Sequence, residues 1–230
     1  DLAELLLFGL NQQSGGVALR APLPADEAVR TLEALVARRI QETPYRAYLW
    51  SLASDVYFHE GRQRHRSMSL DLSALTENPI DILLPEDWLG LAALENATRL
   101  EPMNYLYHDL LMERILELGR IDLAAEACRR SVAAYPALSE HASLLRPHLE
   151  PELLEAAILG FEDSRQQDSM IPRGVVESDA GLLLWLNGKP ERASAFLERA
   201  VSQAPNLFEA QYWLGLATYT LGEYERAIRH

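Results

Sequence analysis

The sequence has little cysteine, little positive charge and no long apolar run, and each shortage excludes a class of protein. Cys128 is the single cysteine among 230 residues, so no disulfide can form within the chain. Lysine and arginine total 21 against 34 acidic residues, and the net charge of −13 argues against general binding to nucleic acid or anionic lipid. No apolar run approaches the roughly 20 residues that cross a bilayer. These features leave the compartment open between cytoplasm and periplasm.

Sequence motifs of catalysis and of metal binding are missing as well. The 6 histidines form no pair with another histidine or with cysteine at metal-ligand spacing on one helix face. The sequence contains neither a Gly-rich phosphate loop after a strand nor a Gly-x-Ser-x-Gly elbow. Cys128 falls at a core position of an expected helix, which favours a buried apolar role. We therefore expect no enzyme activity, no cofactor and no metal.

What the sequence does contain is a period of 34 residues in its small side chains. Three pairs share this spacing: Gly181 and Gly215, Gly188 and Gly222, and Ala193 and Ala227. Gly119 and Ala124 precede Gly188 and Ala193 by 69 positions, which is two periods plus one residue. The period predicts a repeated structural unit.

The residue types of the repeat predict a helix hairpin. Glycine at positions 119, 188 and 222 can end a first helix in the left-handed conformation. Alanine five residues later lets two helices approach closely, and Pro102, Pro136 and Pro205 would end the second helices. One hairpin cannot bury its own apolar face, so neighbouring hairpins must stack.

Residues 174–207 resemble a tetratricopeptide repeat, and residues 105–138 and 208–230 resemble further copies. The positions that carry the resemblance are Gly181, Leu184, Gly188, Ala193, Leu197, Ala200 and Pro205. The resemblance implies an all-α fold, a right-handed α–α superhelix of about five helix pairs plus a truncated sixth. We expect one solenoid domain over residues 1–230. Because the sequence begins without methionine and stops inside an expected helix, we interpret it as a piece of a longer protein.

The remaining helices are predicted from capping and proline positions. They cover residues 1–12, 25–41, 45–60, 87–100, 137–146 and 151–166. Residues 62–86 show no clean helical period, and we expect a long loop there, inserted between the two helices of one repeat.

In the tetratricopeptide-repeat family the first helices line the concave surface, and this implies a partner-binding face. The matching positions are Asp109, Glu113, Ser178, Leu182, Trp185, Tyr212, Leu216 and Tyr219. The inserted repeat would add Trp50, Ser54 and Tyr57. Such an acidic and aromatic groove would suit a basic partner segment with apolar anchors. The alternative is that individual aromatic residues pack against the next repeat.

A dense basic run stands out in this acidic chain: Arg62, Arg64, His65 and Arg66. Its functional interpretation is an anion site, for a phosphate, a lipid headgroup or an acidic partner. Its alternative is a solvated segment that pairs with the acidic faces of the protein.

The leading functional hypothesis is a scaffold that binds another protein or peptide on its concave face. The alternative comes from residues 94–136, which are similar in style to the repeat regions of bacterial O-antigen ligase or polymerase proteins. It would make the chain a soluble periplasmic docking or regulatory domain of a membrane glycan polymerase or ligase. The sequence leaves the partner and the oligomeric state open.

Overall fold

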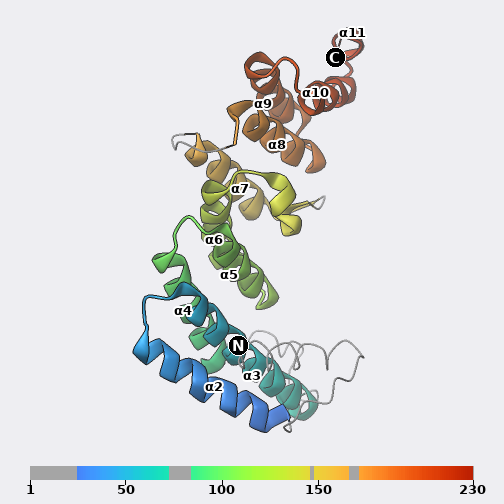
Figure 1. Cartoon of the computed structure of the whole chain (residues 1–230). Helices are drawn as coiled ribbons and strands as arrows, with labels where there is room; N and C mark the ends of the chain where they lie inside the picture. Colours follow the sequence, from blue (N-terminus) through green and yellow to red (C-terminus); the bar gives the residue numbers. More distant parts are fainter. Residues whose placement is uncertain (1–24, 73–83, 146–147, 166–170, 230) are drawn as a thin grey trace. The chain divides into compact units, whose positions relative to one another are not determined.

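The computed structural model describes residues 25–72, 84–145, 148–165 and 171–229 (Figure 1). These residues form α-helices and short 3-10 turns without any strand, which confirms the all-α prediction. The chain divides into two compact units, residues 1–101 and 102–230. That one solenoid continues through both units stays a prediction, and the helix predicted over residues 1–12 lies outside the described residues.

The first unit holds α2 (Ala25–Glu42), α3 (Ala47–Leu72) and α4 (Pro85–Leu100). Val29, Leu32 and Val36 recur every three or four positions and so form one stripe along α2. This stripe is buried in a single cluster with Ala53 and Val56 of α3. The apolar periodicity of the sequence therefore becomes the core of the first unit.

Helix α3 is longer than the sequence analysis predicted. The expected loop from residue 62 is wrong over residues 62–72, because α3 runs on to Leu72. Residues 62–72 contain no proline or glycine, and their arginine, glutamine, leucine and methionine are good helix formers. The rest of the expected loop, up to residue 83, lies outside the described residues.

The second unit alternates first helices and second helices, except that α6 and α7 are two successive second helices. Its first helices are α5 (Tyr105–Glu117), α8 (Arg173–Leu186) and α10 (Phe208–Thr220). Its second helices are α6 (Ile121–Ala134), α7 (Pro151–Ser164), α9 (Pro190–Gln203) and α11 (Tyr224–Ala227). Helix α5 packs on α6, α8 on α9 and α10 on α11, and α10 also packs on α9, as stacked hairpins require.

The turns between paired helices confirm the role predicted for glycine. Gly119, Gly188 and Gly222 have φ angles of 71°, 67° and 78°, in the left-handed region. In each turn the amide after the glycine donates to the carbonyl five residues earlier: Arg120 to Ile115, Lys189 to Leu184, and Glu223 to Thr218. This is the Schellman arrangement, which satisfies carbonyls that the helix end leaves open.

The ends of the second helices confirm the role predicted for proline. Helices α4, α6 and α9 end at Leu100, Ala134 and Gln203, each two residues before a proline. A residue that precedes proline is pushed out of the α conformation, so the helix must stop there.

Small residues let the helices of one hairpin approach closely. A Cβ atom on Gly181 of α8 would lie 2.5 Å from Cγ of Leu197 on α9, so only glycine fits. Ala193 at the start of α9 is fully buried. The small residues of the repeat are therefore packing requirements of the hairpin.

The segment before α7 differs from the sequence prediction. The helix expected over residues 137–146 is wrong: the chain forms two 3-10 turns, Leu138–Glu140 and Ala142–Leu144. We name residues 137–145 the strap. Its amide at Leu138 donates to Oδ2 of Asp179 on α8 at 2.9 Å, and His141 bonds to Asp109 of α5, so the segment is held by the neighbouring first helices. Helix α7 follows at Pro151, as predicted.

Ion pairs join successive second helices of this unit. They are Arg129 of α6 with Asp163 of α7, Arg192 of α9 with Glu155 of α7, and Arg226 of α11 with Glu198 of α9. The partners are partly exposed, so each pair contributes little to stability by itself.

Glu177 of α8 makes a buried version of such a link. Its side chain is 1% exposed, and its carboxylate lies 3.0 Å from Nε of Arg165 and 2.9 Å from Nη2 of Arg199. Arg165 directly follows α7, and Arg199 lies on α9. The carboxylate of Glu177 on α8 therefore links three helices.

We predict that Ala193→Leu lowers the free energy of unfolding by about 1–3 kcal/mol, because a larger side chain overpacks the α8–α9 contact. Ala195→Leu, on the exposed face of the same helix, should change it by less than about 0.5 kcal/mol. Urea denaturation of both variants checks this. Equal stability of the two variants would show that the register of the repeat is misassigned.

We also predict that Glu177→Gln costs about 1–3 kcal/mol, because it leaves two arginines without their charged partner in a buried position. The matched variant is Glu155→Gln in the exposed pair with Arg192, which should cost less than about 1 kcal/mol. Thermal unfolding of both variants separates buried from exposed pairing, and a larger loss in Glu155→Gln would contradict the assignment.

Candidate partner-binding face

Most residues predicted for the concave face lie on α5, α8 and α10, and they differ in exposure. Glu113, Tyr212 and Tyr219 are exposed, while Leu182, Trp185 and Leu216 are half-buried. Tyr212 and Tyr219 expose 48% and 62% of their surface, so both phenol rings can reach a partner. We keep the name predicted concave face for these six residues.

Two other predicted residues are engaged inside the protein. Ser178 is 3% exposed and belongs to the core of the second unit, so it presents no surface to a partner. Asp109 accepts hydrogen bonds from His141 and Ser131, and its side chain is 15% exposed. Both residues are therefore corrected from partner-contacting to structural positions, because neighbouring segments of the chain already cover them.

Helices α8 and α10 bring four aromatic side chains into one cluster. The ring centroids of Trp185 and Trp213 are 5.4 Å apart, those of Trp213 and Tyr212 are 5.0 Å apart, and those of Tyr212 and Phe208 are 6.1 Å apart. We name these four residues the aromatic cluster. Phe208 at its edge is 71% exposed, so the cluster reaches from half-buried indoles to open solvent.

Sequence reasoning found two members of the aromatic cluster and missed two. Phe208 and Tyr212 are four positions apart, a spacing that places them on one side of a helix and could have identified Phe208. Trp213 follows Tyr212 directly and lies at no signature position of the face, so only the packing of α10 against α8 reveals its role. Tyr219 lies outside the cluster and contacts Tyr224 of α11 edge to face.

Carboxylates accompany the aromatic cluster. Glu209 is exposed in the first turn of α10, three positions before Tyr212. Burial raises the pKa of Asp179 on α8, the Leu138 amide and the His141 charge oppose that rise, and Glu209 adds to it. On α5, burial and then the charge of Asp109 raise the pKa of Glu113. The negative charges within each of these two groups thus interact with one another.

The residues of the first unit that were predicted for the face make contacts within the protein. Ser54 is fully buried. Trp50 donates its indole N–H to the carbonyl of Pro44 at 2.8 Å, and both Trp50 and Tyr57 pack against the apolar cluster of α2 and α3. Trp50 and Tyr57 therefore stabilise the first unit, and Ser54 presents no surface to a partner.

The basic run lies on α3 and not in a loop. Arg62 is exposed, and residues 64–66 continue the same helix. The side chains of Arg64, His65 and Arg66 lie outside the described part of the structure. An anion site at this run stays a prediction.

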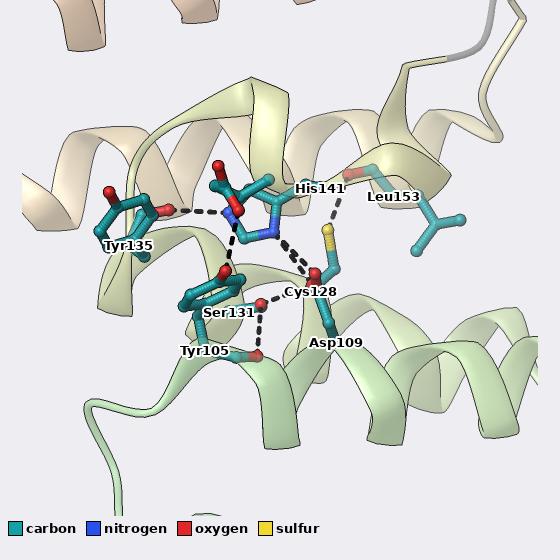
Figure 2. A network of polar contacts seen from close by, with 8 residues as sticks. Tyr105, Asp109, Cys128, Ser131, Tyr135, His141 and Leu153 are labelled. Atoms are coloured by element: carbon teal, nitrogen blue, oxygen red, sulfur yellow. Dashed lines mark hydrogen bonds and ion pairs between the residues drawn. The ribbon is translucent and has the colours of Figure 1, made fainter.

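Asp109, Ser131 and His141 lie together but do not form a nucleophilic triad (Figure 2). Nδ1 of His141 is 3.0 Å from Oδ1 of Asp109, and the Ser131 hydroxyl donates to the same oxygen at 2.6 Å. In a triad the imidazole accepts the serine proton, whereas here both side chains bond to the carboxylate. Among the described residues, no group of three or more metal-ligating side chains could hold a metal ion.

A comparison with known protein families gives a match at the end of the chain. Residues 178–230 match the tetratricopeptide-repeat family. The match covers α10 and α11, α9 and most of α8, which carry the aromatic cluster. None of the curated proteins compared with the chain matches it.

Two solved structures are similar to the chain at low identity. The MamA protein is 15% identical with a TM-score of 0.36, and the similarity covers 77% of this chain and 87% of MamA. PilF of Pseudomonas aeruginosa is 19% identical with a TM-score of 0.35, covering 74% of this chain and 73% of PilF. Within the described residues, no helix is long and apolar enough to cross a membrane.

Cys128 on α6 is buried, and burial followed by the charge of Asp109 raises the pKa of its thiol to about 12. We predict that a thiol reagent leaves it unmodified in the folded chain near pH 8 and modifies it fully in denaturant, because the thiolate is the reactive form. Rapid modification of the native chain would contradict the burial of Cys128.

Proposed function

We propose that the second unit is a protein-interaction module whose aromatic cluster and neighbouring carboxylates bind a basic partner segment with apolar anchors. The observation that carries the proposal is the exposure of Phe208 and Tyr212 at the edge of a continuous aromatic cluster. Exposed aromatic residues that adjoin half-buried aromatic residues are typical of binding surfaces, where aromatic side chains supply much of the affinity.

The charge distribution supports a basic partner. The chain carries a net charge of −13, and Glu209 stands beside the aromatic cluster. Opposite charges on the two surfaces would speed association and select against acidic competitors. A tetratricopeptide-repeat segment is consistent with this role, since such repeats bind other proteins or peptides.

The test is selection from a displayed peptide library on the whole chain, followed by affinity measurement of the selected peptides. We expect lysine, arginine and apolar residues to be enriched. The Trp185→Ala/Tyr212→Ala double variant should weaken binding by about tenfold or more, because it removes two anchors of the cluster. Raising the salt concentration should weaken binding further.

The control variant is Leu159→Ala, which truncates an exposed apolar residue on α7, away from the first helices. It should leave the affinity unchanged. The proposal fails if the folded double variant binds the selected peptides as tightly as wild type. Circular dichroism of each variant distinguishes a lost contact from a lost fold.

A docking domain of a bacterial membrane glycan polymerase or ligase is the other hypothesis for the same chain. It rests on the style of residues 94–136 alone. Apolar runs of about 20 residues elsewhere in the full-length protein would favour it.

A further inference from the structure

The strap is fastened to the first helices on both of its sides. Asp179 of α8 accepts the Leu138 amide at 2.9 Å. On the α5 side, the Tyr105 hydroxyl donates to Glu140 at 2.9 Å, and His141 bonds to Asp109. The strap thus connects α5 and α8, and much of that connection to α5 depends on one histidine.

His141 is fully buried, and both of its ring nitrogens face oxygen acceptors (Figure 2). Nδ1 lies 3.0 Å and 3.1 Å from the two carboxylate oxygens of Asp109, and Nε2 lies 2.7 Å from the carbonyl of Tyr135. A neutral imidazole has a single N–H, so it would turn a lone pair toward one of these acceptors. The geometry is therefore that of an imidazolium, which donates in both directions.

Several other titratable groups face this imidazole. Asp109 and the Tyr105 ring come from α5, Tyr135 follows α6, Glu140 belongs to the strap, and Asp179 comes from α8. The Cys128 thiol of α6 interacts electrostatically with Asp109. Three carboxylates thus act on the ring: those of Asp109, Glu140 and Asp179.

The balance of these influences favours the charged ring. Burial lowers the pKa of His141, but the hydrogen bond and charge of Asp109, the Tyr135 carbonyl and the charge of Glu140 outweigh burial and raise it above the ordinary 6.5. The side chain therefore keeps its proton to a higher pH when the chain is folded than when it is unfolded.

We propose that the His141–Asp109 ion pair is a pH-sensitive clasp that holds the strap on α5 most tightly in its protonated state and weakens when the imidazole loses its proton. A neutral ring has one N–H for two acceptors, so its lone pair faces either the carboxylate of Asp109 or the carbonyl of Tyr135. The strap then keeps its bonds from Leu138 to Asp179 and from Tyr105 to Glu140, while its attachment to Asp109 loses the attraction between opposite charges.

The direction of the pH effect follows from the raised pKa. A group with a higher pKa in the folded state stabilises the fold fully below its unfolded pKa, here about 6.5. That contribution disappears as the pH rises through the folded pKa. The clasp is therefore strongest in acid and weakens toward alkaline pH, by about a factor of ten in its equilibrium constant for each unit by which the pKa is raised.

The deciding measurement is an NMR titration of the histidine ring signals of the whole chain between about pH 5 and pH 10. The signal of His141, identified by its loss in His141→Asn, should titrate above 6.5, the ordinary value. Titration of His141 at or below 6.5 would overturn the proposal.

Unfolding in urea tests the consequence for stability. The difference in midpoint between wild type and His141→Asn should be largest below about pH 6.5 and shrink as the pH rises. His148→Asn is the matched control and should match wild type throughout. A difference that stays constant with pH would reduce His141 to a packing residue and overturn the clasp.

Asp109→Asn keeps the test decisive even if His141→Asn fails to fold. Asparagine has the same shape without the charge, so the pKa of His141 should fall when the carboxylate of Asp109 no longer favours the protonated ring. An unchanged titration of His141 in that folded variant would show that Asp109 does not hold the proton.

Discussion

The close approach of paired helices at small residues is the constraint on which the second unit depends. Gly181 admits Leu197 where any Cβ would collide, and Ala193 is buried at the same crossing. This contact sets the distance between α8 and α9, and α10 then packs against both helices. The indoles of Trp185 and Trp213 meet only because these spacings hold. The candidate binding surface is thus a product of packing at positions that no partner touches.

The periodic part of the fold could be predicted from sequence because each signal has a local cause. Glycine in the left-handed conformation and proline after the helix end act within one or two residues of where they stand. The extension of α3 also has a local cause, the run of good helix formers without proline or glycine, which an apolar period alone does not reveal. The strap escaped prediction because its cause is not local. The strap depends on Asp179 and Asp109, which lie about 30 to 40 positions away in sequence and are adjacent only in the folded chain.

The same reasoning explains what was right and wrong at the candidate site. Family positions assume a regular first helix in every repeat. The strap replaces one of these helices and uses Asp109, so a position expected to contact a partner became structural. Tyr212 and Tyr219 are exposed as expected, since α10 follows the regular pattern.

The ion pairs of the second helices use part of the positive charge of the chain. Each of three arginines pairs with an acidic residue of the neighbouring second helix: Arg129, Arg192 and Arg226. This part of the positive charge is therefore neutralised within the fold.

The strap also has a consequence for the register of the repeats. The spacing of 69 residues between Gly119 and Gly188 exceeds two periods by one residue. An extra residue inside an α-helix would rotate everything after it by about 100°. Two short 3-10 turns do not fix the rotation of the helices that follow them. The strap can therefore contain the additional residue while the helices before and after it keep their apolar faces buried. The strap is thus a segment whose length can depart from the 34-residue period without changing which faces of the neighbouring helices are buried.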